Sequence, residues 1–296
     1  MTSKREQKEI DATTKLIELA FEEDFSDLGD LTSLAMIPKE ATATVQIVAR
    51  EQGILAGFTV VKQLFAMLDK SVQIKQLVAD GDVLKPQMVV AEVSGSLQSL
   101  LAGERIALNF LTHLSGIATL TRQFVDAVQG TKAQILDTRK TQPGYRLLEK
   151  QAVRAGGGTN HRMGLYDGCM IKDNHIAGWK ENAADDFDDS IAAAIQYVRE
   201  QITVNVPIEV EVDQLTQLED VLDAQPDIVL LDNMSLDMLR EAVAIRDKTS
   251  PPTLLEASGG VTLATVAEIA KTGIERISVG ALTHSAMGLD LAFDWK

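Results

Sequence analysis

The stretch VPIEVEVDQLTQLEDVLDAQPDIVLLDN, residues 206–233, decides the fold class. Two short apolar runs, 206–213 and 227–233, are typical of strands, and an amphipathic stretch at 215–225 separates them. A strand, a helix and a strand in this order indicate parallel pairing, because a parallel partner requires a crossover long enough to hold a helix. The stretch therefore predicts one strand–helix–strand unit of a parallel sheet.

The same alternation fills the second half of the chain. Four further segments predict strands, at 133–141, 168–175, 253–260 and 276–285. Amphipathic stretches typical of helices lie between strands at 186–201, 236–248 and 262–273. Six such units fit a (β/α) barrel, complete or short of eight strands, better than an open sheet, because no Gly-rich nucleotide fingerprint follows the first strand.

The first half of the chain has a different pattern. Helical or strand patterns predict a small α+β domain built from a helix at 12–23, a strand region at 43–57, a helix at 58–68 and two or three short strands at 71–96. Leucines and other apolar residues at helical spacing from 97 to 129 predict one long helical segment that links the two halves, with Gly116 as the place where it could break.

Composition narrows the function classes. The chain has 296 residues, 45% of them hydrophobic, and a formal net charge of −15, which disfavours a nucleic-acid partner. Only Tyr145 and Tyr166 stand near its most basic stretch, too few aromatic residues for stacking on bases. The single cysteine, Cys169, excludes an intramolecular disulfide. Without an apolar leader or a long apolar run, we expect no membrane partner and a cytoplasmic protein.

Polar side chains follow the predicted strands at the points where the strands end. In a barrel all these ends meet at one face, where barrel enzymes build their sites. The early strands contribute cations and the later ones carboxylates, so we expect a site with both; the residues are Asp137, Arg139, Lys140, Lys172, Asp173, Asn174, His175, Glu209, Glu211, Asp213, Asp232, Asn233, Glu256 and Ser258.

The segment 137–175 concentrates positive charge in an acidic chain, with seven Lys or Arg against four Asp or Glu. Three of the cations are spaced by four residues, which predicts the solvated face of a helix: Arg146, Lys150 and Arg154. The other four stand at strand ends or beside a glycine run, where charge is costly unless an anion compensates it: Arg139, Lys140, Arg162 and Lys172.

Two glycine-containing loops suit phosphate, because each follows a predicted strand and can present backbone N–H groups: 258–261 and 279–285. Glu211 and Asp232, at the ends of consecutive strands, are candidates to bind ribose hydroxyls or a hydrated Mg²⁺. The alternative is that they are buried carboxylates neutralised by the basic strands.

Eight motifs cover nearly the whole sequence in order: GDLTS (29–33), GERIALNFLTHLSGIAT (103–119), DTRKTQPGYRLLEKQAVRAGGGTNHRMGLYD (137–167), IKDNH (171–175), EVEVD (209–213), LLDN (230–233), LEASGG (255–260) and SVGALTHS (278–285). These motifs are similar to those of the quinolinate phosphoribosyltransferase family. The resemblance implies phosphoribosyl transfer from phosphoribosyl pyrophosphate to quinolinate, with Mg²⁺ and with decarboxylation, in NAD biosynthesis.

The resemblance also implies an architecture. It implies an N-terminal α/β sandwich domain, 1–115, rejoined by the C-terminal tail, 284–296, and an open, seven-stranded α/β barrel, 116–283. Family members are dimers, sometimes hexamers, in which the N-terminal domain of one subunit closes the barrel site of another. By that likeness Arg105 reaches the quinolinate bound to the neighbouring subunit.

Roles follow from the resemblance residue by residue. The expected ligands for the quinolinate carboxylates are Arg139, His161, Arg162 and Lys172, and Thr141 is an expected substrate-binding residue. The expected catalytic residues are Lys140 and Lys172, near the phosphoribosyl donor, and Glu211 and Asp232, near the ribose and the metal. The expected 5′-phosphate site consists of Ser258, Gly259, Gly260, Gly280, Ala281 and Leu282.

Dense positive charge agrees with this reaction, because a dicarboxylate and a phosphorylated sugar can share one pocket only if cations offset their repulsion. One alternative is a transferase acting on nicotinate, but a monocarboxylate needs fewer cations than the Arg105, Arg139, Arg162 and Lys172 set provides. Another is a non-catalytic protein that sequesters an anionic metabolite, which would need neither Glu211 nor Asp232.

Overall fold

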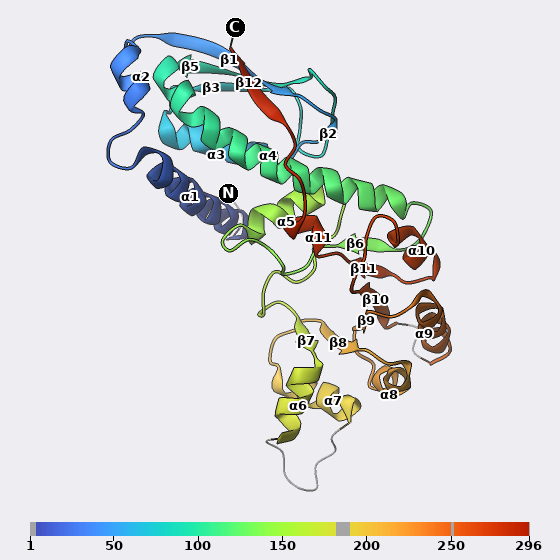
Figure 1. The fold of residues 1–296 in the computed structure, drawn as a ribbon. Helices are drawn as coiled ribbons and strands as arrows, with labels where there is room; N and C mark the ends of the chain where they lie inside the picture. The colour runs from blue at the N-terminus through green and yellow to red at the C-terminus, as the bar shows by residue number, and fades with distance from the viewer. Residues whose placement is uncertain (1–3, 182–189, 250–251, 296) are drawn as a thin grey trace. The chain divides into compact units, whose positions relative to one another are not determined.

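The computed structural model describes residues 4–181, 190–249 and 252–295 (Figure 1). Residues 186–189 of the predicted amphipathic stretch 186–201 lie outside this description. The chain forms two compact units. The first consists of Met1–Arg122, Lys140–Gly158 and Leu282–Lys296, and the second of Gln123–Arg139 and Thr159–Ala281.

An antiparallel sheet forms the centre of the first unit. Its strands lie in the order β12 (Leu291–Trp295), β1 (Thr42–Ala49), β5 (Val89–Ser96) and β3 (Gln73–Gln76), and a separate two-stranded ladder joins β2 (Gly53–Ile54) to β4 (Val83–Leu84). The predicted inward residues of β1 are fully buried: Val45, Ile47 and Ala49. The pairing of β12 with β1 brings the last strand of the chain into the sheet formed by its first strands.

The helices of the first unit are α1 (Lys4–Phe25), α2 (Leu31–Met36), α3 (Phe58–Leu68), most of α4 (Leu97–Ala127), α5 (Arg146–Ala155) and most of α11 (Ala281–His284). The expected break of α4 near Gly116 was wrong, because the helix is continuous. A Cβ on Gly116 would lie 2.1 Å from the carbonyl oxygen of Met287. This glycine therefore lets the C-terminal segment pack against the helix.

Helix α5 corrects a second expectation. Arg154 is exposed, as predicted, but Lys150 is fully buried, so the solvated face predicted for Arg146, Lys150 and Arg154 was wrong at its centre. The neighbouring Leu148, Glu149, Ala152 and Val153 are also buried, which leaves little of this short helix exposed. Helical spacing assigns residues to a shared face but does not say how much of the helix the protein covers.

A six-stranded parallel sheet forms the centre of the second unit. The strands lie in the order β6 (Gln134–Leu136), β11 (Arg276–Ser278), β10 (Leu254–Ser258), β9 (Ile228–Asp232), β8 (Ile208–Val212) and β7 (Cys169–Ile171). All six strands expected in this half are confirmed, and the chain has an α/β fold. A parallel bridge from Leu136 to Thr159 lies outside the named strands and adds one further pairing at the edge formed by β6.

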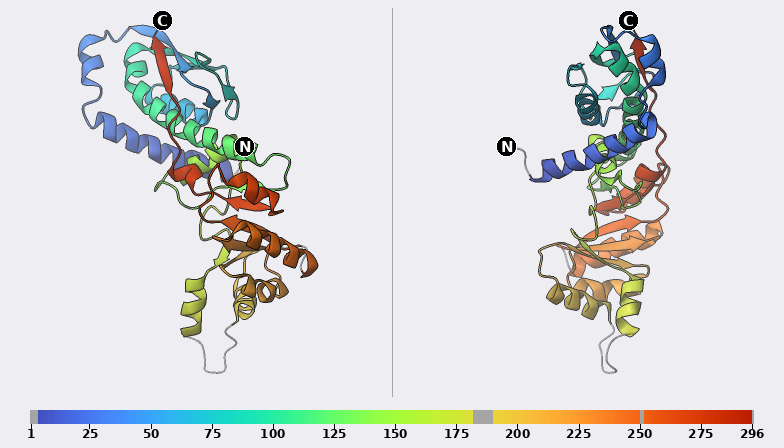
Figure 2. Two further views of the ribbon diagram at one scale, coloured as in Figure 1. Left: turned by 45° about the vertical axis from the view of Figure 1, so that its right-hand side comes forward. Right: turned by 90° about the vertical axis from the view of Figure 1, so that its left-hand side faces the viewer.

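Helices follow the strands of this sheet, as the alternation predicted. They are α6 (Asp173–Glu181), α7 (Ile191–Gln201), α8 (Leu218–Asp223, after a short 3₁₀ turn at Leu215–Gln217), α9 (Leu236–Thr249) and α10 (Val266–Lys271). Helix α9 contacts both α8 and α10, and the three lie one after another along the sheet (Figure 2). Within the described residues, no helix combines the length and the apolar character that crossing a membrane would require.

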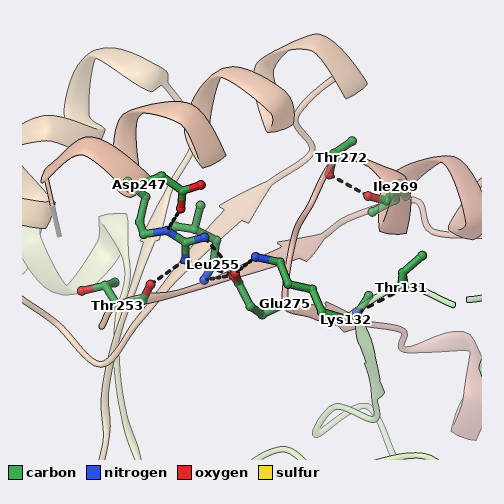
Figure 3. Close-up of polar contacts among 10 residues, drawn as sticks. Thr131, Lys132, Asp247, Thr253, Leu255, Ile269, Thr272 and Glu275 are labelled. Carbon is green, nitrogen blue, oxygen red and sulfur yellow. Dashed lines mark hydrogen bonds and ion pairs between the residues drawn. The ribbon is translucent and has the colours of Figure 1, made fainter. Parts of the chain in front are cut away.

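Paired charges hold the amino-terminal edge of this sheet. Arg246, only 3% exposed, donates from two guanidinium nitrogens to Glu275 over 2.8 and 3.1 Å and from one of them to the carbonyl of Thr253. Glu275 also accepts the backbone N–H of Leu255 and pairs with Lys132 over 2.5 Å (Figure 3). Thr253, Glu275 and Lys132 stand just before β10, β11 and β6, so the cluster fixes the starts of three strands.

Candidate active site

The pleat of the parallel sheet places charged side chains on one face. Glu211 pairs with Leu230, Leu230 with Glu256, and Glu256 with Arg276, so these positions share one level and one face. The alternate positions carry buried apolar residues, among them Val210, Leu231, Ala257 and Ile277. Strand alternation thus separates an apolar face from a face that bears carboxylates and a guanidinium group.

Two of the expected catalytic residues meet at the carboxyl ends of the strands. The Lys172 ammonium, next to the end of β7, contacts the carboxylate of Glu211 on β8. Both side chains are partly exposed, at 38% and 19%. Asp232, the last residue of β9, lies on the same face of the sheet as Glu211, because Leu230 pairs with Glu211 and stands two residues before it.

The first candidate phosphate loop has the backbone geometry that its glycines suggest. Gly259 and Gly260 adopt φ angles of 92° and 60°. A Cβ on Gly259 would lie 2.1 Å from the side-chain oxygen of Asn233, so no other residue fits at this position without a rearrangement. The backbone N–H of Asn233 donates to the carbonyl of Ser258 over 2.9 Å. The ends of β9 and β10 are therefore locked together beside Asp232.

Arg162, expected to bind a substrate carboxylate, lies in the field of a second expected ligand, Arg139. Burial and the nearby positive charge of Arg139 both lower the pKa of Arg162. The Arg162 guanidinium donates to the carbonyl of Gly168 over 2.8 Å. Asp167 accepts the backbone N–H groups of Met163 and Gly164, which fixes the loop that carries Arg162. Neighbouring guanidinium groups that repel each other are well suited to bind a dianion.

His161 forms the centre of a buried charge cluster that the sequence did not reveal. Its Nε2 lies 3.1 Å from a carboxylate oxygen of Glu209 and 3.4 Å from one of Glu256. The second carboxylate oxygen of Glu256 accepts from Nε of Arg276 over 2.7 Å. Glu209 and Glu256 occur at inward positions of β8 and β10, so strand alternation combined with parallel register was the signal that could have found them.

Charges within this cluster balance each other. Burial lowers the pKa of His161, but hydrogen bonds and charges from Glu209 and Glu256 outweigh it and raise that pKa to about 9. Burial raises the pKa of Glu209, whereas His161 and Arg276 together outweigh burial and lower the pKa of Glu256. The backbone nitrogen of Arg162 lies 2.8 Å from Nδ1 of His161, which places a candidate substrate ligand directly beside the cluster.

Two carboxylate groups could hold a metal ion. Mg²⁺ prefers oxygen ligands and retains water, and Glu211 and Asp232 offer half-buried carboxylates on one face of the sheet, so their chemistry fits a hydrated Mg²⁺. Among the described residues, His161, Glu209 and Glu256 also place one ligand atom each within 4.8 Å of one another. Arg276 already pairs with the carboxylate of Glu256, so this second, buried group is better suited to a structural role than to metal binding.

A cavity of about 300 Å³ lies beside Arg162 and the buried cluster, and its walls include His161, Glu209 and Arg276. Among the remaining expected site residues, Gly280 and Ala281 belong to the second unit, and four others belong to the first. Arg105 is exposed on α4, and Leu282 is buried on α11. Lys140 and Thr141 stand between β6 and α5, where Nε of Arg146 donates to the hydroxyl of Thr141 over 3.0 Å.

Comparison with known proteins supplies the family. The family model described as "Quinolinate phosphoribosyl transferase, N-terminal domain" matches residues 30–115. The model described as "Quinolinate phosphoribosyl transferase, C-terminal domain" matches residues 117–294. A probable nicotinate-nucleotide pyrophosphorylase [carboxylating] of Bacillus subtilis is 43% identical over 281 residues, 95% of this chain and 92% of that protein. The corresponding enzyme of Mycobacterium leprae is 41% identical over 290 residues, 97% and 98% of the two chains.

A solved structure agrees with these relatives. The nicotinate-nucleotide pyrophosphorylase from Francisella tularensis superimposes with a TM-score of 0.87 at 36% identity, covering 97% of each chain. Both matched domains and the relatives span nearly the whole sequence. The chain belongs to the quinolinate phosphoribosyltransferase family.

Proposed function

We propose that the chain is a carboxylating nicotinate-nucleotide pyrophosphorylase. It transfers phosphoribosyl from phosphoribosyl pyrophosphate to quinolinate and releases pyrophosphate and CO₂, which gives nicotinate mononucleotide for NAD biosynthesis. Family membership supports the reaction. The observation that supports the site is the pair of mutually repelling guanidinium groups, Arg139 and Arg162, in the unit where Lys172 meets Glu211.

In the proposed site, cations hold the dicarboxylate. Arg139 and Arg162 bind carboxylates of quinolinate, and the guanidinium of Arg162 is already oriented by the carbonyl of Gly168. The charge cluster around His161 fixes the backbone beside Arg162 from within the sheet. Lys172 leaves its contact with Glu211 when a substrate anion competes for the ammonium group.

Charge development explains the carboxylates of the site. Cleavage of the bond between ribose and pyrophosphate gives the ribose oxocarbenium character, while the departing pyrophosphate gains negative charge. Glu211 and Asp232 stabilise the positive ribose, and Lys140 and Lys172 stabilise the leaving group. The ring nitrogen of quinolinate bonds to the ribose carbon as pyrophosphate leaves and becomes positively charged. The bond between C2 and its carboxylate then breaks and releases CO₂. The electron pair stays on C2, where the adjacent positive nitrogen stabilises it until a proton from water replaces the carboxylate. Positioning and neutralisation suffice, so no nucleophilic side chain is required.

Two further elements complete the proposed site. Glu211 and Asp232 would hold a hydrated Mg²⁺, which would supply additional neutralisation of the pyrophosphate. The backbone of Ser258, Gly259 and Gly260 with that of Gly280, Ala281 and Leu282 binds the 5′-phosphate. Backbone N–H groups suit this task, because they donate to phosphate without adding a side chain to the site.

The decisive test is incubation with quinolinate, phosphoribosyl pyrophosphate and Mg²⁺, with CO₂ and nicotinate mononucleotide measured together. We expect equal amounts of both products. Nicotinate in place of quinolinate tests the alternative transferase, which would form the same nucleotide without CO₂ at an equal or higher rate. That second result would overturn the proposal.

We also propose a homodimer, or a hexamer built from such dimers, in which Arg105 of one subunit reaches the site of another. Arg105 is exposed on α4, which leaves its guanidinium available to a neighbouring molecule. Mixing the inactive variants Arg105→Ala and Lys172→Ala should restore part of the activity through hybrid dimers. No recovery after mixing confirmed by mass spectrometry would contradict a shared site.

The finer architecture is part of the proposal. We propose an open seven-stranded barrel at 116–283 and an N-terminal sandwich domain at 1–115 joined by the tail 284–296. The bridge between Leu136 and Thr159 supports a seventh strand beside β6, since two backbone hydrogen bonds also join these segments. A location in the cytoplasm stays a prediction.

A further inference from the structure

The segment that carries Lys140 is held from two sides. Lys140, Thr141 and Gln142 lie outside regular structure between β6 and α5. The hydroxyl of Thr283 donates to the carbonyl of Lys140 over 2.7 Å. The carboxylate of Glu149, fully buried on α5, accepts the backbone N–H of Gln142 over 3.3 Å and lies 3.0 Å from Nε2 of His113. Side chains therefore determine where this backbone lies.

Thr283 makes an unusual contact for a helical threonine. Hydroxyls of threonine in helices commonly bond the carbonyl four residues earlier, as Thr121 bonds that of Ile117. Thr283, which is 2% exposed, instead bonds a carbonyl 143 positions away in sequence. Thr283 also directly follows the segment Gly280–Leu282 that we assign to the 5′-phosphate. One side chain thus ties the phosphate segment to the backbone of Lys140.

We propose that Thr283 is a positioning residue that couples the phosphate-binding segment 280–282 to Lys140. This inference rests on the proposed roles of those residues. A lysine side chain has many rotamers, so the place of its ammonium group depends strongly on a fixed backbone. Small displacements of a charged group cost activity in the chemical step more than in substrate binding. The hydroxyl of Thr283 therefore supports turnover through Lys140.

The test compares Thr283→Val, which keeps the shape and removes the hydroxyl, with Thr283→Ser, which keeps it. Thr253→Val is a matched control, because Thr253 is 1% exposed and its hydroxyl donates over 2.8 Å to the distant carbonyl of Pro226, at the other end of β10. For each variant, kcat, both KM values, the melting temperature and amide hydrogen exchange of residues 140–145 are measured.

We expect Thr283→Val to lower kcat about tenfold, because a factor of this size corresponds to the free energy of one hydrogen bond. The KM for quinolinate should stay unchanged. Thr283→Ser should keep at least half of the wild-type kcat, and Thr253→Val should lower the melting temperature without lowering kcat. Exchange at 140–145 should rise only in Thr283→Val. Equal kcat values for the two valine variants, or equal losses in Thr283→Val and Thr283→Ser, would overturn the inference.

Lys140→Ala separates this inference from the site assignment. If Lys140→Ala is inactive, the kinetic comparison above decides the role of Thr283. If Lys140→Ala retains wild-type turnover, the proposed role of Lys140 is wrong. In that case hydrogen exchange decides whether Thr283 holds the backbone of Lys140. Unchanged exchange at 140–145 in Thr283→Val would overturn this coupling as well, and faster exchange would support it.

Discussion

The two ends of the parallel sheet use charge in different ways. At the amino-terminal edge, Arg246 and Glu275 satisfy each other through a forked ion pair, and the cation is almost fully buried. At the carboxyl-terminal end, Lys172 and Glu211 touch but remain partly exposed. Arg162 donates to the carbonyl of Gly168 just before β7, and burial together with the positive charge of Arg139 lowers its pKa. Charges that are fully paired stabilise the fold, whereas charges that remain accessible or repel each other can bind a ligand.

The largest effect should come from the structural end. Arg246→Met removes a buried cation and leaves Glu275 without its forked partner, so we expect the free energy of unfolding to fall by about 3–5 kcal/mol. Turnover at low temperature should stay at the wild-type value. Urea unfolding and steady-state kinetics at 15 °C measure both.

Lys132→Met is the milder variant at the same edge. Lys132 is 53% exposed in its contact with Glu275, so its loss should cost less than about 1 kcal/mol. A fall in kcat for folded Arg246→Met or Lys132→Met would show that the two ends of the sheet are not functionally distinct.

The next effect concerns the catalytic end. Glu211→Ala and Asp232→Ala should each lower kcat about 10²- to 10³-fold, because each removes a carboxylate that stabilises the positive ribose. Quinolinate affinity should change less than about threefold, since the dicarboxylate binds to cations. Kinetics and calorimetric titration separate the two quantities.

Asp237→Ala is the matched control, because that carboxylate is 95% exposed on α9. It should leave kcat and affinity unchanged. The reverse pattern for Glu211→Ala, with affinity lost and turnover kept, would favour a protein that only sequesters an anion.

A smaller effect concerns pH. In the folded protein the pKa of His161 is about 9, above the ordinary value of 6.5. The contribution of protonated His161 to folding stability is therefore complete below pH 6.5 and is lost as the pH rises through about 9. The unfolding free energy of the wild type should therefore fall across this window by at most about 1.4 kcal/mol per pH unit.

His161→Gln should remove this slope, as measured by urea unfolding at pH 6, 7.5 and 9. His284→Gln, at an exposed position, should keep it; equal slopes in both variants would contradict the charge cluster.

Sequence patterns predicted the elements of this fold well where a single periodicity was decisive. Strand and helix alternation located all six strands of the parallel sheet, because each strand is a short apolar run between amphipathic stretches. Their polar ends marked Lys172, Glu211 and Asp232, which the structure places directly after β7, on β8 and at the end of β9, three adjacent strands of one sheet.

Tertiary contacts decided the features that were missed. Gly116 did not break α4 because its missing Cβ makes room for Met287, a contact 171 positions away that no local pattern contains. Lys150 is buried because of what packs around α5, although its spacing from Arg154 suggested a solvated face. The pairing of His161 with Glu209 and Glu256 required the register of strands distant in sequence.

The most direct measurement is a double-mutant cycle on quinolinate binding with Arg139→Met, Arg162→Met and the double variant, followed by calorimetric titration. If both guanidinium groups hold the dicarboxylate, each single variant should bind about 10- to 100-fold more weakly, and the effects should not add. Binding within twofold of the wild type in either single variant would contradict the account.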